Sequence, residues 1–240
     1  MSPPKQLAVA ADECDRTGDG QLSVSARFIR ARDACMSLSA VYAFMRSSDV
    51  ARVVEDSVVV GDDSVSFRAA RTKELSRVSR SDARTAAMWL GRVSDDEVVC
   101  PVKWFRRFQA LRSEVGFGAD QRQYFCAVNG DVITSSTVAQ VLRRLILDVE
   151  DARASGKLAT PHALRGSMSS AALDMGVTLD DVLRQGRWKQ ASTFWHYYDR
   201  RGLVGIQLPP DGGCRLVEWP ARLAQVVRES FTGSAARRFR

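Results

Sequence analysis

The sequence predicts a mainly α-helical α+β fold with a small antiparallel β-sheet, and three observations lead to this prediction. Apolar residues recur three and four positions apart over residues 25–54, which is typical of a helix with one buried face. Two short valine-rich runs then flank Gly61-Asp62-Asp63, which is the pattern of a β-hairpin. Most of residues 161–201 consists of helical patterns separated by helix start and stop residues.

The length and composition of the chain fit one globular domain with tails. Of the 240 residues, 45% are hydrophobic and 26% are charged. We expect a flexible leader over residues 1–24, the main domain over 25–201, and a tail over 202–240 that can hold one further helix. The formal net charge of +7 fits a polyanionic partner such as DNA.

Neither the apolar runs nor the cysteines indicate a membrane or secreted protein. No apolar run approaches the roughly 20 residues of a membrane span, and the first residues lack the apolar core of a secretory signal. The five cysteines are scattered, with no pair at CxxC spacing, so neither a disulfide framework nor a zinc site is expected. We therefore expect an intracellular protein, in the cytoplasm or the nucleus, without a resident metal or cofactor.

One segment has the ligand spacing of the first half of an EF-hand calcium loop. Residues 15–23 place oxygen-bearing side chains at the first, third and fifth positions and Gly20 at the sixth. The twelfth position, where a calcium loop carries a bidentate glutamate, is Ala26. We therefore expect a polar turn here and no calcium site.

The first helix is expected to begin at Ser25, because a serine hydroxyl can accept a hydrogen bond from the first turn. The helical pattern runs to about residue 54 and is interrupted by a turn near Ser47-Ser48. Its apolar face consists of residues three and four apart: Ala34, Leu38, Val41, Tyr42 and Met45.

A small sheet and two helices follow. The hairpin pairs residues 58–60 with 65–67, and residues 83–93 are a candidate third strand that their alanine and methionine content leaves open. After Pro101 an apolar stripe predicts a helix with three arginines beside it, Arg106, Arg107 and Arg112. Residues 124–128 form a short apolar run that ends at the turn signal Asn129-Gly130, and residues 136–149 form an amphipathic helix.

The last third is punctuated by residues that start and stop helices. Pro161 fits a first helical turn, and Gly176 is a suitable C-terminal stop. Thr178 and Asp181 form a cap pair for a short helix that ends at Gly186. The other helices expected here cover residues 162–175, 189–201 and, in the tail, 219–231.

The strongest chemical pattern is His162-Ala163-Leu164-Arg165, followed by Gly186-Arg187-Trp188 and then Tyr197. On a helix, His162 and Arg165 lie three residues apart and share a face. This places an acid/base group beside a guanidinium, as a phosphoryl-transfer site needs. An HxxR pair alone is more often a surface pair, so the prediction depends on the whole ordered set.

The ordered set resembles the tyrosine recombinase (phage integrase) family, and the resemblance covers roughly residues 25–200. That family has an arginine in an early helix, a lysine on a β-hairpin, an HxxR box, a histidine or tryptophan, and a tyrosine about nine residues further on. Trp188 lies nine positions before Tyr197. The resemblance implies the catalytic-domain fold of that family and a partner of double-stranded DNA.

Two upstream segments also resemble parts of the family pattern. Residues 44–50 resemble the first arginine box, with Arg46 as the arginine and Asp49 in place of the usual glutamate. Lys73 lies after the hairpin, near the position of the family lysine, although Arg71 can occupy that position instead. Members of the family assemble as multimers on DNA, and a C-terminal segment often docks on a neighbouring protomer. Residues 219–231 are a candidate for that role, or for folding back on their own domain.

The resemblance implies a metal-independent reaction that cuts DNA and conserves the energy of the cut bond. Tyr197 would attack phosphorus and form a 3′-phosphotyrosyl bond. His162 would assist the proton transfer from the tyrosine, and Lys73 would protonate the leaving 5′ oxygen. Tyr198 adjoins Tyr197 and would be the nucleophile if the helix were shifted by one residue.

The remaining site residues would stabilise the charge that builds up on phosphorus. The pentavalent transition state carries extra negative charge, which fixed guanidinium groups can bind through two N–H groups at once. Arg46 and Arg165 would fill this role on the non-bridging oxygens. Trp188 would donate its indole N–H to one of them or pack the site.

Two other functions share parts of this pattern. A type IB topoisomerase uses the same tyrosine, arginine and lysine chemistry, but the Trp188 box and the HxxR pattern favour a site-specific recombinase or integrase. Relaxation of supercoils without site preference would favour the topoisomerase. A non-catalytic DNA-binding module that retains the fold would bind DNA strongly and form no covalent adduct.

Overall fold

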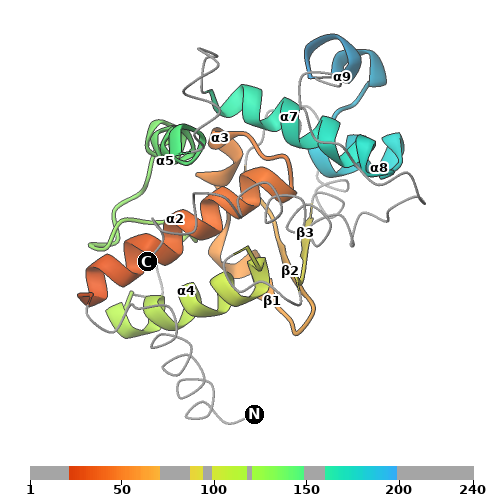
Figure 1. The fold of residues 1–240 in the computed structure, drawn as a ribbon. Coiled ribbons are helices and arrows are strands. Elements are labelled where there is room, and N and C mark those ends of the chain that lie inside the picture. The colour runs from red at the N-terminus through yellow and green to blue at the C-terminus, as the bar shows by residue number, and fades with distance from the viewer. Residues whose placement is uncertain (1–21, 71–86, 94–98, 118–120, 149–159, 199–240) are drawn as a thin grey trace, which may run out of the picture.

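The computed structural model describes residues 22–70, 87–93, 99–117, 121–148 and 160–198, and this part of the chain consists of helices and one small sheet (Figure 1). The α+β class predicted from the sequence is confirmed. Within the described ranges the elements, in chain order, are α2 (Val24–Tyr42), α3 (Ser47–Val50), a 3-10 turn η2 (Glu55–Ser57), β1 (Val59–Val60), β2 (Ser64–Phe67), β3 (Met88–Gly91), α4 (Pro101–Val115), α5 (Ser135–Asp148), α7 (Pro161–Asp174), α8 (Leu179–Gly186) and α9 (Ala191–Tyr197).

The first helix begins two residues earlier than the sequence predicted. Ser23, and not Ser25, is the N-cap of α2, and its Oγ accepts a hydrogen bond from the Ala26 amide at 3.2 Å. The prediction of Ser25 was wrong because both serines have the right chemistry, and only Ser23 has the extended backbone that a cap requires. The predicted break at Ser47-Ser48 was also misplaced, because α2 ends at Tyr42 and these two serines begin α3.

The two serines give a matched test of this cap. Changing Ser23 to alanine is expected to lower the free energy of unfolding by about 1 kcal/mol, because the Ala26 amide loses its acceptor. Ser25→Ala is the control, since Ser25 lies inside the first turn and alanine is the best helix former. Urea unfolding followed by circular dichroism measures both, and equal losses in the two variants would contradict the assignment.

The sheet is antiparallel, with β2 between β1 and β3. The predicted hairpin is confirmed, with Val60 paired to Val65 across the turn, and the candidate third strand is confirmed as β3, which pairs with β2 from Ser64–Gly91 to Phe67–Met88. Side chains alternate along β2 and β3, so that one set is buried and the other faces outward. The exposed Trp89 lies on the outward face, opposite Ser66.

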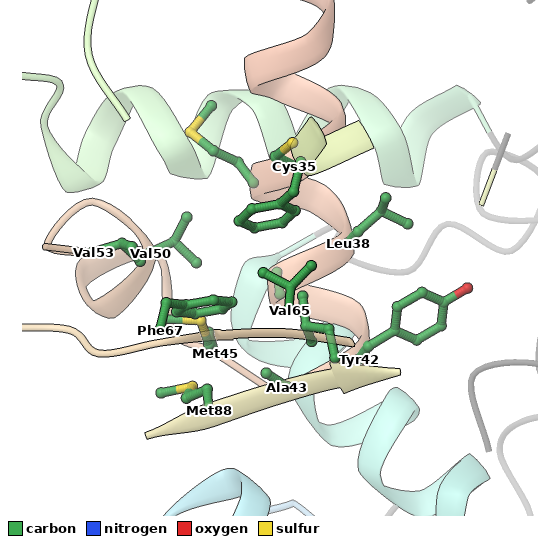
Figure 2. Close-up of a cluster of buried hydrophobic side chains, with 14 of the residues drawn as sticks. Cys35, Leu38, Tyr42, Ala43, Met45, Val50, Val53, Val65, Phe67 and Met88 are labelled. Carbon is green, nitrogen blue, oxygen red and sulfur yellow. The ribbon is translucent and has the colours of Figure 1, made fainter. Parts of the chain in front are cut away.

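The buried face of the sheet packs against α4, and side chains from the C-terminal part of α2 belong to the same core. Figure 2 shows this core, in which side chains from helix and sheet point toward one another: Cys35, Leu38, Tyr42, Ala43, Met45, Val50, Val53, Val65, Phe67 and Met88. Phe105 of α4 stacks on Phe67 and on Tyr124, each with a ring-centroid distance of 5.7 Å. The apolar stripe predicted for α4 is therefore the part of the helix that fixes it on the sheet.

Two arginines of α4, Arg107 and Arg112, are buried rather than exposed beside the stripe. Arg112 is buried, donates to the Tyr124 carbonyl and pairs with Glu55 at 2.6 Å. Burial raises the pKa of Glu55, and Arg112 opposes that shift. This pair ties α4 to the segment after α3, which places the early part of the chain relative to the sheet.

The later helices begin and end close to the predicted residues. Thr160 caps α7 by accepting from the Ala163 amide at 3.1 Å, and Pro161 occupies the first position. Thr178 caps α8 by accepting from the Asp181 amide at 3.2 Å, and α8 ends at Gly186 as predicted. The helix expected over 189–201 begins only at Ala191, and its described part ends at Tyr197.

Several predictions concern residues outside the described ranges. These are the leader up to residue 21, most of the calcium-loop resemblance, Arg71 and Lys73, and the tail with its expected helix at 219–231. Among the described helices, none combines the length and the apolar character needed to cross a membrane.

Candidate active site

The HxxR pair lies in the first turns of α7 and presents its two side chains in different environments. The cap by Thr160 and the proline after it fix where α7 starts, so that His162 is near the helix N-terminus and Arg165 is one turn further on. His162 is exposed, whereas Arg165 is only 2% exposed. The ring of Tyr198 contacts both side chains, as expected if His162 and Arg165 share one face of the helix.

Arg165 joins three segments that are far apart in the sequence. Its Nη1 donates to the Phe44 carbonyl, and its Nη2 donates to the Gly186 carbonyl. The guanidinium carbon lies 4.2 Å from the ring centroid of Trp188 and 5.3 Å from that of Tyr198. A planar group with donors on two sides and two faces for stacking can make all four contacts at once, which an ammonium group cannot.

The segment that leads to Arg46 has an unusual backbone. Phe44 is fully buried and has a φ of 49°, a left-handed conformation that is uncommon for a bulky residue. Its carbonyl accepts from Arg165, and its ring lies 6.4 Å from that of Trp188. The site thus holds Phe44 in a strained conformation, directly after Ala43, the C-cap residue of α2.

Arg46 follows two residues later and is the N-cap residue of α3. Its guanidinium is partly exposed and lies 3.7 Å from the carboxylate of Asp49, which is buried. Because two residues span at most about 7 Å of backbone, Arg46 starts close to the Phe44 carbonyl that Arg165 binds. Asp49, the acidic residue of the predicted arginine box, therefore lies against Arg46, the arginine of that box.

Trp188 is placed by a tight helix end. Arg187 has a φ of 56° and closes α8, and the Trp188 amide donates to the Leu183 carbonyl at 2.9 Å. The indole then folds back over Gly186, where an added Cβ would lie 1.8 Å from a ring carbon. Its Nε1–H is buried and has no hydrogen-bond partner among the residues that the structure describes. The donor role that the sequence predicted for Trp188 stays a prediction, and this buried N–H is the group that it concerns.

The two adjacent tyrosines differ sharply in environment. Tyr198 is 6% exposed, and its ring lies 4.7 Å from that of His162 and 4.9 Å from that of Trp188, between centroids. Tyr197 is 59% exposed, and its ring lies 4.5 Å from that of His196 between centroids. The structure therefore brings Tyr198, and not Tyr197, against the HxxR pair.

Three of the side chains that meet here were expected from the sequence, and the groups that hold them were not. His162, Arg165 and Trp188 lie together, and Arg46 lies on the segment that Arg165 binds. Phe44 was not assigned a role, and Gly186 was noted only as a helix end beside Trp188, because only tertiary contacts identify a strained phenylalanine or a glycine under an indole ring. No family model, curated protein or solved structure matches the chain. A functional assignment therefore depends on the chemistry of this cluster.

Proposed function

We propose that this protein is a site-specific DNA recombinase or integrase that cuts and rejoins strands through a 3′-phosphotyrosyl intermediate. One observation carries the proposal: an imidazole, a guanidinium, an indole and a phenol from α7, α8–α9 and the end of α9 meet at one place. These groups are the ones that attack on a phosphodiester by a tyrosine requires. The resemblance of the sequence motifs to tyrosine recombinases supports the same assignment.

The proposed reaction begins with attack of a phenolic oxygen at the end of α9 on phosphorus. The oxygen–phosphorus bond forms while the bond from phosphorus to the 5′ oxygen breaks, and the electron pair of that bond stays on the 5′ oxygen. His162 accepts the phenolic proton, and Lys73, the lysine that the resemblance assigns, gives a proton to the leaving oxygen. A 5′ hydroxyl of another strand reverses these steps and rejoins the DNA, so no ATP is consumed.

The arginines and the tryptophan act on the charge of the transition state. Donors that are fixed before the reaction stabilise developing charge better than donors that must reorient. Arg165 is fixed by two backbone carbonyls and two ring faces, and Arg46 lies against a buried carboxylate. The buried indole N–H of Trp188 is a further donor. We propose that these three groups bind the non-bridging oxygens of the phosphate.

The proposed partner is double-stranded DNA, bound by a multimer of the chain. A formal net charge of +7 supports binding to the phosphate backbone, which weakens steeply as the salt concentration rises. Such binding would also occur in a protein without catalytic activity. Affinity for DNA therefore does not test the proposal, and a covalent product does.

The covalent intermediate is expected to form on nicked duplex DNA of randomised sequence. A nick placed just after the cleaved bond lets the short released fragment diffuse away, so that the protein stays attached. We expect an adduct that survives denaturation in detergent with the wild-type chain and none with the double variant Tyr197→Phe, Tyr198→Phe. Both changes keep the aromatic rings and remove only the hydroxyls, so the variant is a control matched in packing.

Absence of an adduct from the wild-type chain, in a pool to which it binds, would contradict the proposal and favour the non-catalytic DNA-binding module. A topoisomerase would give a different result. It would relax a supercoiled plasmid of arbitrary sequence at every concentration at which it cuts, whereas the proposed recombinase would select particular sequences from the randomised pool.

A further inference from the structure

We infer that Tyr198, and not Tyr197, is the nucleophile of this site. The inference rests on the proposed function, because it names the attacking group of that same reaction. Spacing from Trp188 favours Tyr197, which lies nine positions further on, whereas Tyr198 lies ten positions further on. The geometry points the other way, since the nucleophile must lie where the activating and charge-stabilising groups meet.

The ring of Tyr198 contacts three of these groups. Its ring contacts the imidazole of His162 at 4.7 Å and the indole of Trp188 at 4.9 Å between centroids. The guanidinium carbon of Arg165 lies 5.3 Å from its ring centroid. Three side chains that the proposed reaction uses therefore lie against the ring of Tyr198.

The backbone of Tyr198 is held as well. Its amide donates to the Phe194 carbonyl at 2.8 Å, and its own carbonyl accepts from the Ser170 hydroxyl at 3.3 Å. The first bond continues α9, and the second ties this residue to α7, the helix that carries the HxxR pair. Two elements thus fix Tyr198 relative to His162 and Arg165.

Tyr197 faces another direction because consecutive residues of a helix differ by about 100° around its axis. Bringing Tyr197 against Arg165 would require α9 to rotate by about that angle or to shift by one residue. Either movement would displace Phe194, which is fully buried and packs edge-on against Trp188 at 5.1 Å between ring centroids. Phe194 therefore fixes the orientation of α9 in which Tyr198 faces the site.

The chain between Trp188 and the two tyrosines is irregular before α9 begins. Residues 189 and 190 between Trp188 and α9 are not helical, so the chain between the tryptophan and the tyrosine is not one continuous helix. A spacing counted along the sequence then no longer determines which side chain returns to the tryptophan. The contact of Tyr198 with Trp188 decides this instead.

In the resulting reaction the Tyr198 oxygen attacks phosphorus and its proton passes to His162. The bond from phosphorus to the 5′ oxygen breaks with its electron pair on that oxygen, which takes up a proton. The product is a 3′-phosphodiester on Tyr198 and a free 5′ hydroxyl. No oxidation or reduction occurs, and the reverse reaction restores Tyr198.

The two single variants and the mass of the modified peptide test this inference. On the nicked randomised pool we expect Tyr198→Phe to lower the rate of adduct formation at least about a thousandfold, and Tyr197→Phe to change it by less than about threefold. Tyr198→Phe keeps the ring that packs on Trp188, and unchanged urea midpoints would show that both variants fold. Digestion of the wild-type adduct should yield the nucleotide on Tyr198.

Other outcomes overturn the inference in distinguishable ways. A nucleotide on Tyr197, with the adduct retained in Tyr198→Phe, would overturn the inference and leave the proposed function standing. If both single variants lose the adduct, the modified residue in the wild-type peptide decides between the two tyrosines. No wild-type adduct at all would overturn the proposed function and this inference together.

Discussion

Replacing Arg165 with lysine is expected to lower the free energy of unfolding by about 2–4 kcal/mol and to abolish adduct formation. The guanidinium donates to the Phe44 carbonyl through Nη1 and to the Gly186 carbonyl through Nη2. A lysine ammonium is a point charge and cannot reach both carbonyls, so one buried acceptor loses its donor. The stacking on Trp188, at 4.2 Å, is lost as well.

Arg184→Lys is the matched control for this variant. Arg184 lies in α8 with its side chain 75% exposed and pairs with Asp181 at 3.0 Å. A surface pair of this kind contributes little, so we expect a change within about 0.5 kcal/mol. Urea unfolding of both variants measures the difference. An Arg165→Lys variant as stable as Arg184→Lys would show that the two carbonyl contacts do not hold the site together.

The second large effect is expected at Gly186, the last residue of α8. An alanine Cβ there would lie 1.8 Å from a carbon of the Trp188 ring, and three ring carbons are within 2.6 Å. The buried indole would have to move, and with it the ring packing on Phe194 and Tyr198. We expect Gly186→Ala to cost about 3 kcal/mol of stability and to suppress adduct formation.

Helix propensity alone would make Gly186→Ala more stable than the wild type, because alanine is favoured over glycine within a helix by about 1 kcal/mol. A net loss therefore has to come from the displaced indole. Gly61→Ala is the control, since its Cβ would meet its nearest atom, the Ser64 carbonyl oxygen, at 3.4 Å. If Gly186→Ala were as stable as the wild type in urea, the close packing of Trp188 on this glycine would be refuted.

Much of the fold could be predicted because its signals are local. The Gly61-Asp62-Asp63 turn between valine-rich runs predicts a hairpin whatever surrounds it, and the structure has that hairpin. The same holds for Thr178, whose hydroxyl caps α8 three residues before Asp181. A cap could not be predicted where two residues of equal chemistry compete, as Ser23 and Ser25 do at the start of α2.

The candidate site was only partly predictable, because its geometry depends on contacts over long separations. The sequence indicates that His162, Arg165 and Trp188 are chemically suited to one site, and the structure brings them together. It gives no sign that Phe44 adopts a left-handed backbone, since the hydrogen bond that holds it comes from Arg165, 121 residues away. Which tyrosine faces the site is likewise a tertiary property, set by how the buried Phe194 orients α9.

The central claim is that a tyrosine at the end of α9 becomes covalently attached to a DNA 3′ phosphate. The most direct test is mass spectrometry of the peptide that contains residues 191–198, taken from wild-type protein incubated with the nicked randomised duplexes and then digested with nuclease and protease. We expect a nucleotide phosphate on this peptide, carried by Tyr198. A peptide without any nucleotide, from protein that bound the same duplexes, would contradict it.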